Sequence, residues 1–275
     1  MLRALIACVA LIFFGCTKKA SDRYVSLNGR DQHIVELGSG EPVVVFVSGF
    51  GDGLDAFDKL QREVSKVTRT ISYDRAGLGN SALMGKDRSL DSLVFELNEI
   101  LQRDNISGPY ILVGHSYGCH ISRYFAHVYP ENVAGIVLLD PGIEDLDDEI
   151  RRMKTAEEIK SYDSLYEFGR DPDWPEGKKR EAHYFRSNEA LLKRKQVKFS
   201  GDIPTTVITA VNMPESTLPF LKGVSQMKIA LHKRWKATFP HIKHVLAENS
   251  GHYVHHDETT LVVDEIKKVI TATRD

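Results

Sequence analysis

Residues 110–118 of this chain read YILVGHSYG, an apolar run that leads directly into a turn of small residues around one serine. The run Tyr110–Val113 predicts a buried strand, and the residues after the turn predict a helix. The two glycines have no side chains that could clash in a tight strand-to-helix turn. A turn of this kind, called a nucleophile elbow, leaves the hydroxyl of Ser116 exposed at the end of a buried strand.

Further apolar runs on either side of this turn indicate the rest of the fold. We expect an antiparallel hairpin from 24–27 and 33–37, and further strands at 43–47, 70–73, 134–139, 205–209 and 242–247. Because helical stretches separate these strands, the pattern predicts a mostly parallel sheet that is covered by helices on both faces. The length of 275 residues, with 42% hydrophobic content, suits one domain, which we place at 24–275.

A charged segment, 143–201, interrupts the alternation after the sixth predicted strand. Helical stretches are expected at 146–159 and 188–197, with prolines and a glycine between them. Aromatic residues within the segment favour packing over a cleft: Tyr162, Tyr166, Phe168, Trp174, Tyr184 and Phe185. We therefore predict an inserted helical lid, with a solvated linker as the alternative.

The first residues have the pattern of a targeting segment. Arg3 precedes the apolar stretch 4–14, which is well short of the roughly 20 residues needed to span a bilayer. The sequence before Cys16 is similar to the lipobox of bacterial lipoproteins. We expect a signal peptide at 1–15, a lipidated Cys16 and a linker at 16–23, which would attach an exported protein to a membrane of the bacterial cell envelope. An ordinary signal peptide, giving a soluble secreted or periplasmic protein, is the alternative.

Charge and ligand spacing argue against two classes of partner. The formal charge of −2 provides no basic field for nucleic acid. His252, His255 and Asp257 lie close together in the sequence, but they lack the H-E-x-x-H spacing, and no Cys/His cluster elsewhere would complete a metal site. We therefore expect no metal.

The partners of Ser116 are sought in loops at the same edge of the sheet. His252, in Ser250-Gly251-His252, lies on the loop after the last predicted strand, from which a neutral imidazole could reach the serine as a general base. Backbone N–H groups are needed for an oxyanion hole. Tyr117, directly after the serine, is one expected donor, and Phe50, in the glycine-rich loop after strand 43–47, is the other.

Five stretches together resemble the α/β-hydrolase superfamily over residues 24–272. They are VFVSGFGD (45–52), YDRAGLGNS (73–81), GHSYG (114–118), GIVLLDP (135–141) and SGH (250–252). The resemblance implies an eight-stranded sheet, a lid, and ester-type hydrolysis without a cofactor. The serine at the elbow, where dehalogenase and epoxide hydrolase members carry aspartate, argues against those two reactions.

The acid that should orient His252 has more than one candidate. Asp140 stands at the carboxyl end of strand 134–139, the edge at which sites form in parallel sheets. The family usually places the acid after the next strand, and there the loop 210–215 offers Glu215 as the rival. Another carboxylate of the segment 143–201 is the third possibility.

These features predict a serine hydrolase that cleaves a small-molecule carboxylic ester or a lipid-like ester. Ser116 would be the nucleophile, His252 the proton shuttle and Asp140 the acid. A proline-type aminopeptidase or another amide hydrolase could use the same triad. A lipoprotein that kept the fold as a non-catalytic binding module is the alternative outside enzymes.

Overall fold

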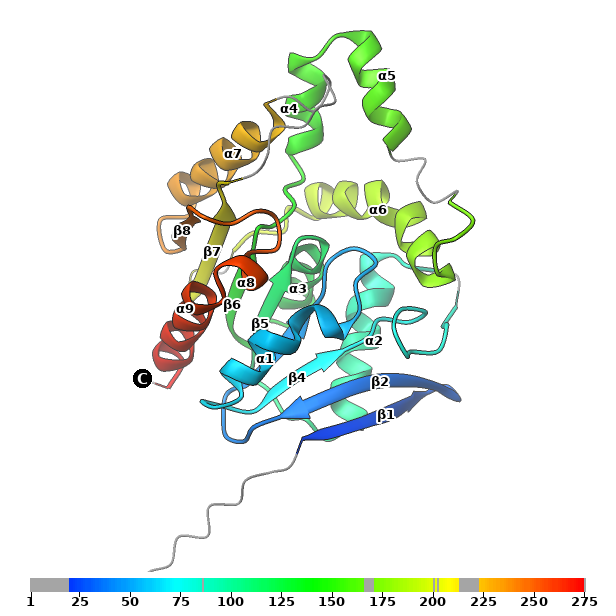
Figure 1. Cartoon of the computed structure of the whole chain (residues 1–275), viewed down its shortest axis with the longest axis vertical. Coiled ribbons are helices and arrows are strands. Elements are labelled where there is room, and N and C mark those ends of the chain that lie inside the picture. Colours follow the sequence, from blue (N-terminus) through cyan, green and yellow to red (C-terminus); the bar gives the residue numbers. More distant parts are fainter. Residues whose placement is uncertain are drawn as a thin grey trace, which may run out of the picture.

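A computed structural model of the chain describes residues 20–85, 87–165, 171–199, 201, 203–212 and 223–274. Its centre is an eight-stranded sheet with the strand order β1-β2-β4-β3-β5-β6-β7-β8 (Figure 1). The strands are β1 (Ser21–Leu27), β2 (Arg30–Leu37), β3 (Val43–Val47), β4 (Thr70–Tyr73), β5 (Tyr110–His115), β6 (Val133–Leu139), β7 (Thr205–Ala210) and β8 (Lys243–Ala247). Only β2 runs antiparallel to its neighbours β1 and β4, so the predicted mostly parallel eight-stranded sheet is confirmed.

Helices cover both faces of this sheet. They are α1 (Asp58–Val64), α2 (Leu90–Arg103), α3 (Tyr117–Val128), α4 (Leu146–Met153), α5 (Ala156–Leu165), α6 (Glu176–Lys195), α7 (Val224–Thr238), α8 (Val254–Asp257) and α9 (Thr259–Ala272), with short 3-10 turns at Leu54–Phe57 and Pro130–Asn132. In Figure 1, α1, α8 and α9 lie on one side of the sheet, while α2 and α3 lie on the other. The arrangement gives three layers around a buried sheet.

The central strands bury side chains on both faces, which explains why their sequences are continuously apolar. In β3, Val43, Val45 and Val47 join the core under α2 and α3. Val44 and Phe46 alternate with them and join the core under α1 and α9. Because side chains alternate along a strand, only a run such as VVVFV can satisfy two apolar cores at once.

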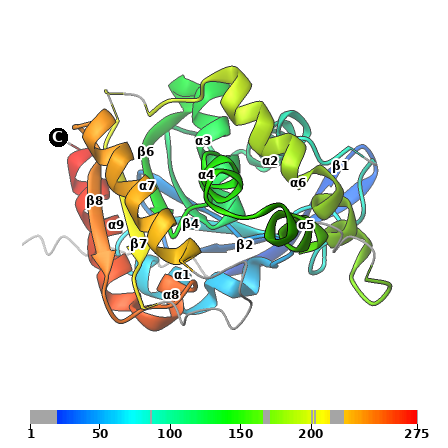
Figure 2. The same ribbon diagram turned by 90° about the horizontal axis from the view of Figure 1, so that it is seen from above.

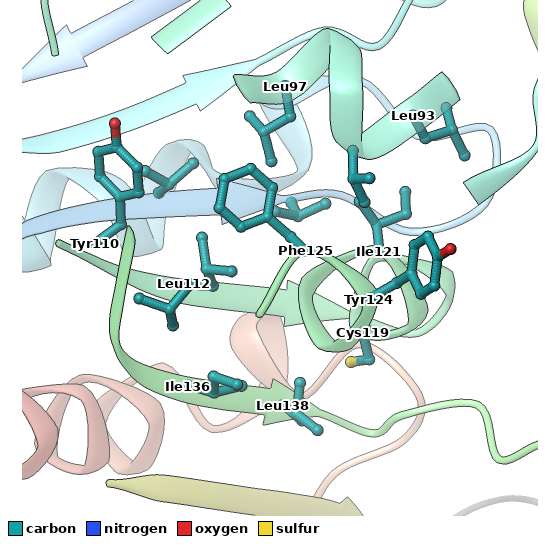
Figure 3. Close-up of a cluster of buried hydrophobic side chains, with 14 of the residues drawn as sticks. Leu93, Leu97, Tyr110, Leu112, Cys119, Ile121, Tyr124, Phe125, Ile136 and Leu138 are labelled. Atoms are coloured by element: carbon teal, nitrogen blue, oxygen red, sulfur yellow. The ribbon is translucent and has the colours of Figure 1, made fainter. Parts of the chain in front are cut away.

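The core under α2 and α3 supports the strand that leads to Ser116. Figure 3 shows side chains of α2, β5, α3 and β6 converging there; the labelled residues are Leu93, Leu97, Tyr110, Leu112, Cys119, Ile121, Tyr124, Phe125, Ile136 and Leu138. Each fully buried side chain of the size of Leu or Phe contributes about 1.5–3 kcal/mol to folding. Cys119 is buried in this cluster as a free thiol, and it therefore packs as a small apolar side chain.

The sheet begins earlier in the chain than the expected domain start at residue 24. Strand β1 pairs with β2 from Ser21 onward, opposite Glu36. Arg23 anchors this extension, because its guanidinium forms ion pairs with Glu36, at 2.7 Å, and with Asp104. Residues 1–19, including Cys16, lie outside the described part of the chain. Among the residues that the structure describes, no helix is long and apolar enough to cross a membrane.

The predicted insertion between β6 and β7 is helical, but its helices have other boundaries than expected. The expected helix 146–159 is broken at Lys154, whose backbone is extended, and α5 begins directly after it. Thr155 and Glu158 explain the new start, because each side chain accepts a hydrogen bond from the other's backbone N–H, at 3.3 and 2.9 Å. This reciprocal arrangement is a capping box, which stabilises a helix N-terminus.

Helix α6 begins twelve residues before the expected helix 188–197, directly after Pro175. Gly177 in its first turn does not break it, because the helix there lies against the loop after β4. A Cβ atom on Gly177 would lie 2.4 Å from the carbonyl oxygen of Gly77, so only glycine allows this approach. Seen from above in Figure 2, α4, α5 and α6 lie over the sheet and the neighbouring helices α2 and α3. Whether they act as a lid remains a prediction.

Candidate active site

The turn at Ser116 has the geometry of a strained strand-to-helix elbow. Ser116 lies between the end of β5 and the start of α3, with φ 50° and ψ −115°. Close packing around it demands the two glycines: a Cβ on Gly118 would lie 2.1 Å from the carbonyl oxygen of Val47, and one on Gly114 would lie 2.7 Å from that of Gly118. A strained backbone held by its surroundings is a feature of functional sites.

The structure brings the three predicted side chains together. The Nε2 atom of His252 lies 3.0 Å from Oγ of Ser116, and its Nδ1 atom lies 2.6 Å from Oδ2 of Asp140. His252 reaches this position from the loop between β8 and α8. Asp140 follows β6 directly with φ 43°, a left-handed conformation that is unusual for a non-glycine residue. Both ring nitrogens of His252 therefore have the partners that a serine–histidine–aspartate relay requires.

Asp140 is fully buried, and its charge is compensated locally. Its Oδ1 atom accepts a hydrogen bond from the N–H of Ala210 at 3.1 Å, and its Oδ2 atom also accepts one from Nζ of Lys228 at 2.5 Å. Burial alone would raise the pKa of Asp140, but the hydrogen bond to His252 and the charge of Lys228 hold the pKa at about 2. Because this lies below the ordinary value of 3.8, the ionised carboxylate stabilises the fold above about pH 4, and this contribution is lost as the pH falls toward 2.

Glu215, the rival acid, lies outside the described residues. An acid in this role accepts the hydrogen bond from Nδ1 of His252, and Asp140 already accepts it. Sequence reasoning missed Lys228 as the second partner of Asp140. The signal for it was present in α7, where Lys228 lies on the same helix face as the buried residues Leu231 and Trp235. A lysine on the apolar face of a helix indicates a buried anionic partner.

The two predicted oxyanion donors flank the serine. Tyr117 is the first residue of α3, where a backbone N–H has no acceptor within the helix and the helix dipole favours negative charge. Phe50 lies in the loop after β3. This loop packs closely against the elbow, because a Cβ on Gly118 of the elbow would lie 2.6 Å from the carbonyl oxygen of Ser48 in the loop. The N–H of the next residue, Gly51, is occupied by Oε2 of Glu181 at 3.0 Å. Phe50 and Tyr117 thus lie on segments that contact each other, and their role as oxyanion donors stays a prediction.

A buried ion pair fixes the loop that carries Phe50. Arg75 donates hydrogen bonds to the carbonyl oxygens of Ser48 and Gly49, at 2.7 and 2.6 Å. The same guanidinium pairs with Glu181 of α6 at 2.5 Å, and both side chains are almost completely buried. Glu181 also accepts the N–H of Gly51. The pair therefore links the inserted helix α6 to the expected oxyanion loop, a role that sequence analysis did not anticipate for either residue.

Replacing Glu181 with glutamine should lower the free energy of unfolding by about 3 kcal/mol, because the guanidinium of Arg75 would stay buried without a counter-charge. Chemical denaturation followed by circular dichroism measures this loss. Glu63→Gln is the matched control, since Glu63 pairs with Lys66 on the exposed surface and should change the stability by less than about 0.5 kcal/mol. Equal losses in the two variants would contradict the role assigned to the buried pair.

His115 positions the loop that carries His252. Its Nε2–H donates to the backbone carbonyl of His252 at 3.0 Å, and its ring lies 4.7 Å from the ring of His252. Burial, and to a lesser degree the neighbouring charge of His252, lowers the pKa of His115 to about 3, so the ring is neutral at ordinary pH. His115 therefore contributes to the site as a hydrogen-bond donor rather than as a second base.

Aromatic side chains from the insertion cover the elbow. The ring of Phe185 stacks on that of Tyr117 at 5.1 Å and meets the edge of Phe50 at 5.7 Å. Trp174 also contacts Phe50, at 5.9 Å, and Nζ of Lys178 lies 4.2 Å from the centre of the Trp174 ring. Tyr166 and Phe168 lie outside the described residues. The insertion thus contributes an aromatic cluster around Tyr117 and Phe50, with the ammonium group of Lys178 at its border.

The side chains considered as metal ligands make other contacts in the structure. In the ranges that the structure describes, no group of three or more His, Cys, Asp or Glu side chains is arranged to hold a metal ion. His255, one of the ligands considered, packs against Phe57 and His115 instead, at ring distances of 4.8 and 4.6 Å.

Comparisons with known proteins agree with this fold. Residues 42–171 match a family model described as alpha/beta hydrolase fold. The chain is 26% identical to the uncharacterized protein YqjL of Bacillus subtilis, over 82% of both proteins. It is 24% identical to the cis-3-alkyl-4-alkyloxetan-2-one decarboxylase of Shewanella oneidensis, over 91% of this chain and 88% of that protein. Among solved structures, the epoxide hydrolase VrEH1 of Vigna radiata matches with a TM-score of 0.68 at 16% identity, over 94% of this chain and 99% of its own.

The chain has the α/β-hydrolase fold, as its sheet, the family match over residues 42–171 and the solved structure show. The family match supports a hydrolytic enzyme as the general class. At 16% identity the likeness to the epoxide hydrolase concerns the fold alone, so the reaction must be inferred from this chain's own residues.

Proposed function

We propose that the protein is a serine hydrolase that cleaves a carboxylic ester through an acyl-enzyme on Ser116. The observation that carries this proposal is the relay from Ser116 through His252 to Asp140, with contacts of 3.0 and 2.6 Å. A nucleophile within hydrogen-bond reach of a base that is itself oriented by a buried acid is the arrangement that activates a serine hydroxyl. Apart from the ester and water, this chemistry needs no further reactant.

The first half of the reaction forms the acyl-enzyme. Oγ of Ser116 attacks the acyl carbon of the ester while Nε2 of His252 takes its proton. Asp140 accepts the Nδ1–H hydrogen bond, which keeps Nε2 free as the base and stabilises the imidazolium that forms. The N–H groups of Phe50 and Tyr117 stabilise the negative oxygen of the tetrahedral intermediate. His252 then donates its proton to the departing alcohol as the C–O bond breaks.

The second half releases the acid. A water molecule takes the place of the alcohol, His252 accepts its proton, and the resulting hydroxide attacks the acyl carbon bound to Ser116. The proton returns to Oγ when the serine leaves. The net reaction consumes one water and yields an alcohol and a carboxylic acid.

The side chains around Ser116 favour an apolar acyl group. Phe50 and Phe185 lie against Tyr117, next to the nucleophile, and aromatic walls stabilise apolar substituents by burial. An ester with an aliphatic or lipid-like acyl chain is therefore the proposed substrate class. The elbow residue also distinguishes this chain from the epoxide hydrolases, in which the resemblance implies an aspartate at this position.

Turnover of matched esters and amides by the mature protein tests the proposal. We expect hydrolysis of activated short-chain esters and a much slower hydrolysis of the corresponding anilides and of N-terminal prolyl peptides. A preference for prolyl peptides would instead favour the aminopeptidase with the same triad. A folded protein that hydrolyses neither class, and whose Ser116 does not react with a fluorophosphonate, would support a non-catalytic binding module.

Attachment to a membrane through Cys16 is a separate proposal, which the pattern of residues 1–19 supports. Changing Cys16 to serine should move the exported protein from the membrane fraction to the soluble fraction of cell lysates, because the acyl chains provide the apolar area that holds it there. Immunoblots of the two fractions measure the distribution. A Cys16→Ser protein that stays with the membranes would exclude the lipid anchor, whereas a native protein found in the soluble fraction would favour the ordinary signal peptide.

A further inference from the structure

Lys228 is the one lysine that contacts the proposed triad within the described residues. It projects from α7 into the interior, and its Nζ atom lies 2.5 Å from Oδ2 of Asp140. Its side chain is 11% exposed and that of Asp140 is 0% exposed. A serine–histidine–aspartate relay does not need a cation at this place, and removing an ammonium group from water is unfavourable. The contact therefore calls for an explanation in terms of the chemistry of the site.

Lys228 and His252 share one oxygen atom. Oδ2 of Asp140 accepts the Lys228 ammonium at 2.5 Å and the Nδ1–H of His252 at 2.6 Å, so the two nitrogens are no more than about 5 Å apart. The other oxygen, Oδ1, is occupied by the N–H of Ala210. The negative charge that should stabilise a protonated His252 is thus partly offset by a positive charge on the same atom.

We propose that Lys228 is a positioning residue that weakens the hold of Asp140 on a protonated His252 and so extends the activity to lower pH. This inference rests on the proposed function, because it concerns the same relay. Lys228 acts only through Asp140 and does not touch the reacting atoms. The physical basis of the proposal is electrostatic: a carboxylate that is paired with an ammonium group attracts a further positively charged partner less strongly than a free carboxylate does.

The size of the effect follows from the separation of the charges. A unit charge at about 5 Å in the partly hydrated surroundings of a protein shifts a protonation equilibrium by on the order of one pH unit. Without Lys228, the ring of His252 should therefore gain its proton at a pH about one unit higher. At a pH below both midpoints, kcat/KM should then be roughly tenfold lower than in the native protein.

Other titratable groups near His252 do not produce this effect on their own. Burial lowers the pKa of His115 and His232 to about 3 and that of His255 to about 2, so these rings are neutral over the tested range. Burial raises the pKa of the Cys119 thiol. Asp52, Tyr253 and His256 also face the site from the loop after β3 and from the segment after β8. These groups are the same in the variants compared below.

The test compares pH profiles of three lysine variants. Lys228→Met removes the charge, Lys228→Arg keeps it, and Lys233→Met removes a charge from an exposed position of the same helix. We expect the acidic limb of kcat/KM for an activated ester to move up by about one pH unit in Lys228→Met, and by less than about 0.2 units in the other two. Should Lys228→Met not fold, Lys228→Gln, which keeps a donor without the charge, carries the same expectation.

The proposal is overturned if folded Lys228→Met or Lys228→Gln keeps the acidic limb of the native protein, or if Lys233→Met shifts it equally. A purely structural role for Lys228 would lower kcat without moving the profile. The protonation midpoint of the His252 ring, followed by NMR with ¹⁵N-labelled histidine, needs no substrate. It therefore tests the inference even if Ser116→Ala keeps its turnover and the proposed function fails.

Discussion

Replacing Ser116 with alanine should reduce kcat for an activated short-chain ester by about 10⁶-fold. The reason is that, among the residues that the structure describes, Ser116 alone combines the elbow geometry with a contact of 3.0 Å to Nε2 of His252. Without Oγ the protein can still bind the ester and polarise its carbonyl group, so a small residual rate over the uncatalysed reaction is expected. Steady-state kinetics on the purified variant measures the loss.

Ser187→Ala is the matched control for this change. Ser187 lies exposed on α6, where its hydroxyl donates to the carbonyl oxygen of Tyr184 in the same helix, and its loss should change kcat by less than twofold. Thermal unfolding of Ser116→Ala should show a stable protein, because alanine removes only one oxygen. Full turnover by a folded Ser116→Ala protein would rule out the acyl-enzyme route.

Replacing Asp140 with asparagine should reduce kcat by on the order of 10⁴-fold. An amide at this position can donate a hydrogen bond to Nδ1 of His252. That hydrogen bond favours the tautomer with the proton on Nε2, and Nε2 in this tautomer cannot accept the proton of the serine hydroxyl. The change also removes the negative charge that stabilises the imidazolium. Glu215→Gln, the variant of the rival acid, should lose less than tenfold, and a larger loss there than at Asp140 would transfer the role to Glu215.

The stability of Asp140→Asn has to be measured alongside its activity. The variant leaves the ammonium of Lys228 buried without a counter-charge, which can cost about 3–5 kcal/mol of stability. Combining Asp140→Asn with Lys228→Met removes both charges and should recover most of that stability without recovering the activity. If the double variant were folded and fully active, Asp140 would have no part in catalysis.

Residues 110–118 were enough to predict much of this molecule. Their apolar run and small-residue turn indicated the buried strand, the following helix and the position of Ser116, because both the strand and the turn depend on local sequence. His252 could be proposed as well, since loops after parallel strands meet at one edge of the sheet. The sequence favours Asp140 over Glu215 because Asp140 stands directly at the end of its strand and Glu215 lies several residues past the next one. The hydrogen bond from His252 to Asp140 agrees with this choice.

Contacts between distant segments could not be predicted in the same way. Glu181 is 106 residues from Arg75, and Lys228 is 88 residues from Asp140. No local pattern states which buried cation faces which buried anion, because that depends on how the helices α6 and α7 settle on the sheet. Charged residues on inward faces of helices are the available signal, and Lys228 and Glu181 both carry it.

Of the helix boundaries in the insertion, one could have been predicted from the sequence and one could not. The break at Lys154 is explained by a local capping box between Thr155 and Glu158, which could have been recognised in the sequence. The early start of α6 could not, because Gly177 normally weakens a helix. It is tolerated here since the backbone of Gly77 lies against it, a contact that exists only in the folded protein.

The buried pair of Arg75 and Glu181 links helix α6 to the loop that carries Phe50. Helix α6 carries Glu181 and the aromatic Phe185, so one helix both fixes the expected oxyanion loop and covers the nucleophile. We predict that a movement of α6 would displace Phe185 and the loop of Phe50 together. In the proposed reaction, this coupling would let the insertion influence the rate.

Mass spectrometry of the protein after reaction with a fluorophosphonate ester tests most directly whether Ser116 is an activated nucleophile. We expect a single covalent adduct on the peptide that contains residues 114–118, located on Ser116, with labelling that is slowed by several orders of magnitude in His252→Gln. An intact protein that stays unlabelled, or one labelled equally fast without the imidazole, would show that Ser116 is not an activated nucleophile.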